Sequence, residues 1–176
     1  MEVADAVKVR RSVRAYDPKE IPADVLERIL EAGRISPSAN NTQPWHFIVI
    51  KDAEKRKVLS KRTWTKFLTE SPVVIVGCGD EKKAEEWYVI DVSIALQTMV
   101  LAATSEGIGT CWIGDFDEDK VRDLCKIPEN YRVVCLIAMG YPREKFDLSK
   151  VFTAGKRRKA LTEIVSYEEF GRSKQD

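Results

Sequence analysis

One long apolar helix, predicted over residues 86–106, restricts the fold more than any other feature of the sequence. Thirteen of its 21 residues are apolar, and they fall around most of the helix. Such a helix must be packed on nearly all sides. Asp91 and Gln97 interrupt the apolar run, and only the 14 residues 92–105 are free of charge, which is too short and too polar for a membrane span. We therefore expect a core helix that also packs against a second subunit, and no membrane association.

The length and composition predict one globular domain over residues 1–176. A chain of this length buries roughly 70% of the surface that its unfolded form exposes. Hydrophobic residues make up 44% of the chain and charged residues 32%, which argues against disorder. The net charge of +1 argues against a general affinity for nucleic acid. No charged segment followed by an apolar one opens the chain, so we expect a cytoplasmic protein without a signal peptide.

The cysteines and the single histidine favour neither a metal site nor a nucleophilic enzyme. No two cysteines form a C-x-x-C pair, and His46 is the only histidine, so a zinc site lacks ligands. A serine or cysteine nucleophile would need His46 as its base, although this residue lies in an apolar stretch. We expect no bound metal and no catalytic side chain. We also expect reduced, buried thiols at Cys78, Cys111, Cys125 and Cys135.

Hydrophobic periodicity predicts helices and strands that mix without strict βαβ alternation. Helices are expected over 2–10, 22–33, 86–106 and 117–124, and strands over 46–51, 72–78, 110–114 and 132–140. Residues 36–44 are turn formers. No G-x-G-x-x-G motif follows a strand, so the fingerprint of the dinucleotide-binding Rossmann fold is absent. The pattern predicts an α+β fold of three layers, in which helices flank a sheet.

The last 26 residues, from Val151, begin with a basic arm. The segment 161–170 (LTEIVSYEEF) follows this arm. It could form an edge strand of the sheet or a tail that is swapped onto another chain.

Two basic clusters near opposite ends of the chain could bind an anion. The first consists of Arg10, Arg11, Ser12 and Arg14. Guanidinium groups and a hydroxyl suit a phosphate, but the alternative is a solvated turn that Asp5 and Asp17 balance. The second cluster is 156–159 (KRRK), and its alternatives are a basic tail or a contact for nucleic acid or an anionic surface. The two clusters could also converge on one anion.

Two loops offer backbone and amide groups to a flat ligand. Residues 37–45 (PSANNTQPW) present N–H groups and amides that suit a ring system with alternating donors and acceptors. In residues 107–114 (GIGTCWIG), the glycines allow the backbone to approach a ligand closely. The alternative for the first loop is an ordinary helix-to-strand connection. For the second, taken alone, a helix end followed by a turn is the better interpretation.

Four segments together resemble the nitroreductase family of flavoproteins. They are RRSVRAYD at 10–17, SPSANNTQPWHFIVI at 36–50, EGIGTCWIG at 106–114 after an apolar helix, and a late basic segment before ALTEIV. They occur in the family's order and span nearly the whole chain. The resemblance implies a three-layer α/β/α sandwich with a mixed, mainly antiparallel sheet. It also implies an intertwined homodimer, in which a C-terminal arm of about 151–176 wraps the partner subunit and two flavin mononucleotide (FMN) sites lie at the interface.

By position, the resemblance implies which residues contact FMN. Its phosphate falls to Arg10 and Ser12, together with Lys156 and Arg158 of the late segment. Arg11 matches a backbone-contact position, and Arg14 would approach the pyrimidine edge of the ring. The partner subunit would line the phosphate–ribityl and dimethylbenzene side with Pro37, Ser38, Ala39 and Asn41. The remaining contacts are Cys111, Trp112, Ile113 and Gly114, the last two under the ring with a backbone N–H near flavin N5.

The chain departs from the family pattern in two places. Many members have an asparagine and a lysine on a helix before the second strand, whereas this chain has TWTKFLTE there. Lys66 matches the lysine, and Thr63 stands where the asparagine would be. Residues 79–90 are too few for the helical excursion that often covers the active site, so we expect an open substrate pocket.

The resemblance implies an oxidoreductase in which the flavin carries the chemistry and the protein binds and orients it. Arg14, and Lys66 with it, would stabilise negative charge near N1 and O2 of the reduced ring. NAD(P)H and a small electron acceptor, such as a nitroaromatic compound or a quinone, would use one face in turn, with ping-pong kinetics. The alternatives are dehydrogenation, reductive dehalogenation or flavin breakdown on the same fold. A non-catalytic module that binds flavin or nucleic acid is a further alternative.

Overall fold

The structure, a computed structural model, describes residues 1–143 and 158–173. Its elements in chain order are α1 (Val3–Val9), α2 (Ala23–Arg34), η1 (Ala39–Asn41), β1 (Trp45–Ile50), α3 (Ala53–Leu59), η2 (Thr63–Thr69), β2 (Val73–Asp80), α4 (Tyr88–Ser105), β3 (Gly109–Ile113), α5 (Glu118–Cys125), β4 (Tyr131–Gly140) and η3 (Leu161–Glu163). The chain divides into two units, Met1–Glu144 and Lys145–Asp176. Each predicted helix and strand of the first unit is present, with bounds that differ by at most two residues.

The four strands form one antiparallel sheet in the order β1-β2-β4-β3. Ile75 of β2 lies opposite Val49 of β1 on one side and Ile137 of β4 on the other. Among the strands described, β1 and β3 form the two edges. The strand pairs of the described sheet are all antiparallel, whereas the resemblance implied a mixed sheet. An isolated parallel bridge joins Ser12 to Thr110, outside the named strands.

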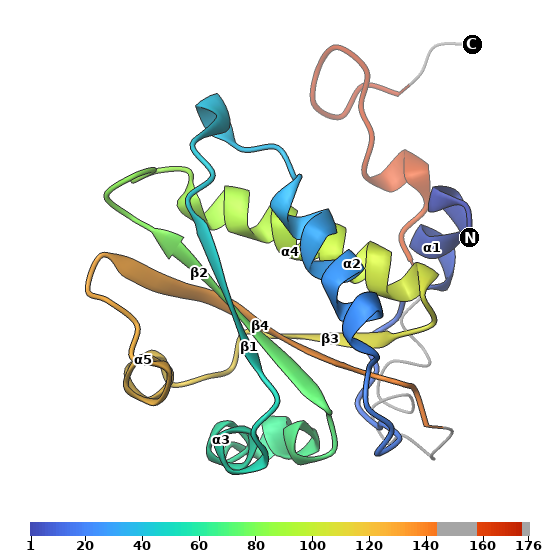
Figure 1. The fold of residues 1–176 in the computed structure, drawn as a ribbon. Helices are drawn as coiled ribbons and strands as arrows, with labels where there is room; N and C mark the ends of the chain where they lie inside the picture. Colours follow the sequence, from blue (N-terminus) through green and yellow to red (C-terminus); the bar gives the residue numbers. More distant parts are fainter. Residues whose placement is uncertain (144–157, 174–176) are drawn as a thin grey trace. The chain divides into compact units, whose positions relative to one another are not determined.

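Helices cover both faces of the sheet, as the sequence predicts (Figure 1). On one face, α2 and α4 pack against residues such as Ile75 and Ile137. On the other face, Val74 packs in a second core with Leu68 of η2 and Val121 of α5. Because β2 is buried on both faces, its sequence is a continuous apolar run and does not alternate between apolar and polar residues. The fold is therefore a three-layer sandwich with a separate core on each side of the sheet.

The central helix α4 is only partly covered by its own chain. Its buried apolar residues are Val92, Ala95, Leu96, Met99, Val100 and Ala103. By contrast, the side chains of Val89, Ile90 and Ile94 are 46%, 48% and 37% exposed. The described residues therefore leave an apolar side of the helix without the cover that the sequence pattern requires.

By length and composition alone, α4 could cross a membrane. It has 18 residues and a mean hydropathy of 1.4, and it is the one such helix in the described part of the chain. The sequence analysis judged the same helix too short and too polar for a membrane span, so the two criteria disagree. The contacts of α4 with α2 and the sheet identify it as a core helix. Length and hydropathy alone do not distinguish such a helix from a membrane span.

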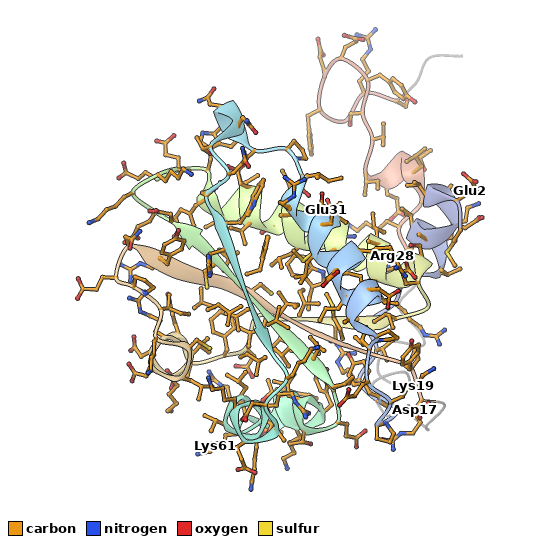
Figure 2. The ribbon with its side chains drawn as sticks, viewed as in Figure 1. Glu2, Asp17, Lys19, Arg28, Glu31 and Lys61 are labelled. Atoms are coloured by element: carbon orange, nitrogen blue, oxygen red, sulfur yellow. The ribbon has the colours of Figure 1, made fainter. Side chains whose placement is uncertain are left out.

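Charged side chains separate the outer side of α2 from its buried side. Figure 2 labels Arg28 and Glu31 on this helix. Arg28 forms ion pairs with Asp24 (2.9 Å) and with Glu106 after the end of α4 (2.8 Å). Such exposed pairs contribute little free energy. The orientation of α2 is set instead by its buried residues, among them Ile29.

The sequence analysis did not predict α3 or assign bounds to η2, which lie between β1 and β2. The Asp52 side chain caps α3 by accepting a hydrogen bond from the Lys55 N–H (2.8 Å). Arg56 of α3 donates to the carbonyls of Thr69 (3.0 Å) and Ser71 (2.6 Å) at the end of η2. These bonds satisfy carbonyl groups that a helix end leaves without intrahelical partners. The two segments therefore stabilise each other on the face that also carries α5 (Figure 1).

The second unit is described for residues 158–173 only. It contains the short 3-10 helix Leu161–Glu163, followed by turns. The predicted edge strand over 161–170 is wrong for this stretch, since no strand forms there. The alternative, a tail swapped onto another chain, stays a prediction.

Candidate cofactor-binding site

The arginine-rich turn lies along the free edge of β3. The N–H of Val13 donates to the carbonyl of Thr110 (2.8 Å), next to the bridge between Ser12 and Thr110. Gly109 permits this approach, because a Cβ at that position would stand 2.8 Å from the side chain of Val13. The fold thus brings together two segments that are almost a hundred residues apart, the first basic cluster and the glycine-rich strand.

A pocket of about 210 Å³ forms where these segments meet the end of α4. Arg10 and Arg11 line it together with Thr104, and the backbone of the glycine-rich segment closes another wall. Ser12 is exposed beside it. Two guanidinium groups, a hydroxyl and backbone N–H groups are the donors that bind phosphate most strongly. Arg10 and Arg11 of the first basic cluster thus lie at one pocket with the glycine-rich segment; that this pocket binds a phosphate stays a prediction.

The backbone at the C-terminal end of β3, where Gly114 follows Ile113, has free space beside it. Ile113 is buried, and its carbonyl accepts a hydrogen bond from the thiol of Cys135 (3.1 Å). A Cβ added to Gly114 would meet no atom of the described residues within 4 Å. Cys111 points into the core beneath the sheet, and Trp112 is partly buried on the opposite face. A flat ligand could therefore approach the backbone at Gly114 without displacing a side chain.

The turn η2 approaches the same end of β3. The guanidinium of Arg62, just before η2, pairs with Asp115, just after Gly114 (2.9 Å). On the other side of η2, Phe67 contacts the ring of Tyr16 at a centroid distance of 6.4 Å. Thr63 and Lys66 are exposed on this turn. These two contacts join the turn η2 to the segment that follows Gly114 and to Tyr16; a role for Lys66 at a cofactor stays a prediction.

Sequence reasoning missed the Arg62–Asp115 pair. Each residue is one of many charged residues, and nothing in the sequence links a position before η2 to one after β3. Only the sheet order, which places η2 and the end of β3 on the same face, reveals the contact.

The loop with the predicted contacts to the partner's cofactor lies elsewhere. Ala39 donates its N–H to the carboxylate of Asp91 (3.1 Å), in the first turn of α4, whereas Thr104 of the phosphate pocket lies in the last. At 1.5 Å per residue, these two positions on α4 are roughly 20 Å apart. The loop also leads into β1, at the edge of the sheet opposite β3. Within one chain, this loop and the phosphate pocket do not come together.

Part of the late basic segment lies outside the described residues. Lys156 lies outside the described residues. Arg158 is exposed and belongs to the second unit, whose position relative to the first is not determined. Their predicted contacts with the phosphate stay predictions.

Burial sets the titration of the groups behind the site. It raises the pKa of Tyr16 well above its usual value, and the Tyr16 hydroxyl donates to the carbonyl of Val13 (2.6 Å). It also raises the pKa of the Cys78 thiol to about 12 and that of Cys135 above its usual value. These groups are neutral near pH 7. They therefore add no negative charge beside the arginine-rich turn.

Comparison with known proteins identifies the class to which this fold and site belong. The model of the nitroreductase family matches residues 7–74 and 59–141, which together cover most of the chain. The chain belongs to the nitroreductase family. A relative from Archaeoglobus fulgidus, provisionally named an NADH dehydrogenase/NAD(P)H nitroreductase, is 36% identical over an alignment of 154 residues that covers 83% of this chain and 88% of the relative.

Solved structures give the same result for the fold. An FMN-dependent nitroreductase from Clostridium difficile R20291 is similar with a TM-score of 0.80 and 30% identity, over 94% of this chain and 98% of that one. A nitroreductase with bound FMN from Bacteroides fragilis NCTC 9343 is similar with a TM-score of 0.77 and 30% identity, over 96% and 100%. The predicted family and the predicted three-layer fold are therefore confirmed.

Proposed function

We propose that the chain is an FMN-dependent oxidoreductase that takes hydride from NAD(P)H and reduces small acceptors such as nitroaromatic compounds and quinones. The observation that carries the proposal is the course of the arginine-rich turn along β3. This course places a donor-rich pocket at one end of the strand and an open backbone position, Gly114, at the other. An elongated ligand with a phosphate at one end and a flat ring at the other fits this arrangement.

The described residues fit FMN in their chemistry. Arg10 and Ser12 would hold the phosphate, with Lys156 and Arg158 added from the C-terminal segment, and Arg11 would contribute a backbone contact. Arg14 and Lys66 would face the pyrimidine edge, and the backbone of residues 111–114 would lie against the ring. Bound FMN supplies hydride transfer at its N5 atom.

The protein's own contribution is binding, orientation and charge. Fixed positive charge at Arg14 and Lys66 would stabilise the reduced form of the flavin, because that form carries more negative charge than the oxidised form. The reaction needs no general base from a side chain, which suits a chain with one histidine. NAD(P)H and the acceptor would then enter the same open space in turn. Only seven residues, 81–87, connect β2 to α4, which favours the open substrate pocket expected from the sequence.

We further propose that the functional unit is a homodimer. A second copy would cover the exposed apolar side of α4, where Val89, Ile90 and Ile94 lie. It would also bring its own Pro37, Ser38, Ala39 and Asn41 to this chain's cofactor, since the chain's own loop is remote from its phosphate pocket. The C-terminal arm, about 151–176, would wrap the partner. Obligate interfaces of this kind often bury over about 2,000 Å².

An anaerobic titration tests the proposed activity. Purified protein loaded with FMN should lose its yellow absorbance on addition of NADH or NADPH, and a nitroaromatic compound or a quinone should restore it. A halogenated phenol, tested in the same way, separates reduction of these acceptors from dehalogenation. Loaded protein that neither nicotinamide cofactor bleaches would be a flavin-binding module, and the proposed activity would be wrong.

A further inference from the structure

Asp91 is the only charged residue that is buried among those described, at 1% exposure. It interrupts an otherwise apolar stretch of α4. A carboxylate in such a place is costly unless it is hydrogen-bonded. One of its oxygens, Oδ1, accepts the backbone N–H of Ala39 (3.1 Å). The buried carboxylate of Asp91 therefore has a role that involves the loop to which it is hydrogen-bonded.

The loop has a backbone that does not hold its conformation unaided. Asn40, Asn41 and Gln43 have φ angles of 50°, 55° and 48°. Asparagine occupies this left-handed region more readily than most residues, whereas a glutamine such as Gln43 seldom does unless its surroundings fix it. The Ser38 hydroxyl accepts the N–H of Gln43 (2.9 Å), but this bond lies within the loop. The bond from Ala39 to Asp91 ties the loop to a core helix.

Two further polar atoms in this region are buried, namely Oδ2 of Asp91 and Oγ1 of Thr42. Neither has a hydrogen-bond partner among the residues that the structure describes. Buried polar atoms without partners are rare in folded proteins. Their presence beside the loop is expected of a region that a second molecule completes.

We propose that Asp91 is a positioning residue for the cofactor. By accepting the N–H of Ala39, it fixes residues 37–41 in the conformation that contacts the FMN bound to the partner subunit. This inference rests on the proposed function, because it assumes that these residues contact FMN. Asp91 itself does not touch the reacting atoms.

The test compares FMN dissociation constants of full-length variants, measured by flavin fluorescence. Asp91→Ala removes the acceptor and should weaken binding about tenfold, as expected for one hydrogen bond to a charged group. Asp91→Asn keeps an acceptor oxygen and should restore affinity to within about threefold of the unmodified protein. Ser36→Ala is the matched control. Its buried hydroxyl donates to the carbonyl of Ala32 in α2 and makes no hydrogen bond to residues 37–41 among those described, so FMN affinity should not change.

A second variant removes the other half of the bond. Ala39→Pro deletes the donor and suits the backbone, because Ser38 before it is extended (φ −141°, ψ 158°). Ala39→Pro and Asp91→Ala combined should weaken FMN binding by less than the product of their separate effects, since both remove one contact. Ala39→Pro also tests the proposal if Asp91→Ala does not fold.

Amide hydrogen exchange of the flavin-free protein supplies an independent readout. Exchange of residues 36–45 should accelerate in Asp91→Ala and not in Ser36→Ala. Unchanged FMN affinity in Asp91→Ala, or an Asp91→Asn variant as weak as Asp91→Ala, would overturn the positioning role. Failure of the unmodified protein to bind FMN would instead overturn the proposed function, and this inference with it.

Discussion

Single residues at the edge of β3 determine what the site can admit. Arg10 and Arg11 supply charge, but their place depends on Gly109, which lets the turn approach the strand. Gly114 has no such neighbour, and its open side is where a ring would lie. The two glycines therefore differ in their surroundings: a side chain at Gly109 would clash, and a side chain at Gly114 would not.

Arg10→Ala and Arg158→Ala should each weaken FMN binding. Loss of a charge-assisted contact to phosphate typically costs roughly 1.5–3 kcal/mol, or about ten- to a hundredfold in affinity. Equilibrium titration of the flavin-free protein measures this. Arg132→Ala is the matched control, because that arginine pairs with Glu81 on the surface. Unchanged affinity in both variants would refute the phosphate assignment.

Stability should fall at high pH because Cys78 is buried. Its pKa is raised from an ordinary 9.0 to about 12 in the folded state. Above pH 9 the unfolded chain releases this proton while the folded chain retains it, so the free energy of unfolding decreases between about pH 9 and pH 12. Urea unfolding at pH 8, 10 and 11 measures the slope. The same slope in Cys78→Ala would show that this thiol does not contribute.

The elements differ in how far the sequence predicted them. β2 and β4 were predictable because buried, β-branched runs have few other structures available. The segment with α3 and η2 depends on contacts of Arg56 with distant carbonyls, which no local pattern reveals. Residues of the candidate cofactor site were likewise predictable only where a local pattern marks them. The motif segments were found, whereas Asp91 and the Arg62–Asp115 pair were not, because their partners are distant in the sequence.

Gly109→Ala should separate the turn from β3. The added methyl would overlap Val13 and Pro142, and we expect a loss of roughly 1–3 kcal/mol in the free energy of unfolding together with weaker FMN binding. Gly114→Ala should leave stability nearly unchanged and still weaken FMN binding, since its methyl enters open space. Chemical denaturation and flavin titration test both variants. Equal losses of stability would contradict the distinction between the two glycines.

For the whole molecule, the apolar side of α4 and the remote position of the loop have one common explanation. Both features make sense if a second copy packs on α4 and exchanges loops. The apolar pattern of the helix predicted a second subunit, and the family resemblance implied the exchange of loops. The described residues add that the chain leaves Ile90 and Ile94 exposed and separates the loop from the phosphate pocket.

Ile94→Glu should disrupt the dimer, because it places a charge in the proposed interface. Light scattering should give a mass close to the 20.0 kDa chain, instead of twice that value for the unmodified protein. FMN affinity should fall at the same time. Lys57→Glu is the control, because it makes a charge change at an exposed position of α3, on the opposite face of the sheet. A dimer that persists in Ile94→Glu would contradict the placement of the interface.

The central claim is that this chain forms a flavin site that two copies share. The most direct measurement is the flavin content of the purified protein, by extraction and chromatography, together with the mass of the same sample by light scattering. We predict one FMN per chain on a particle of about twice the 20.0 kDa chain mass. A flavin-loaded monomer would contradict the shared site. A protein without flavin that also fails to bind added FMN at micromolar concentrations would contradict the account as a whole.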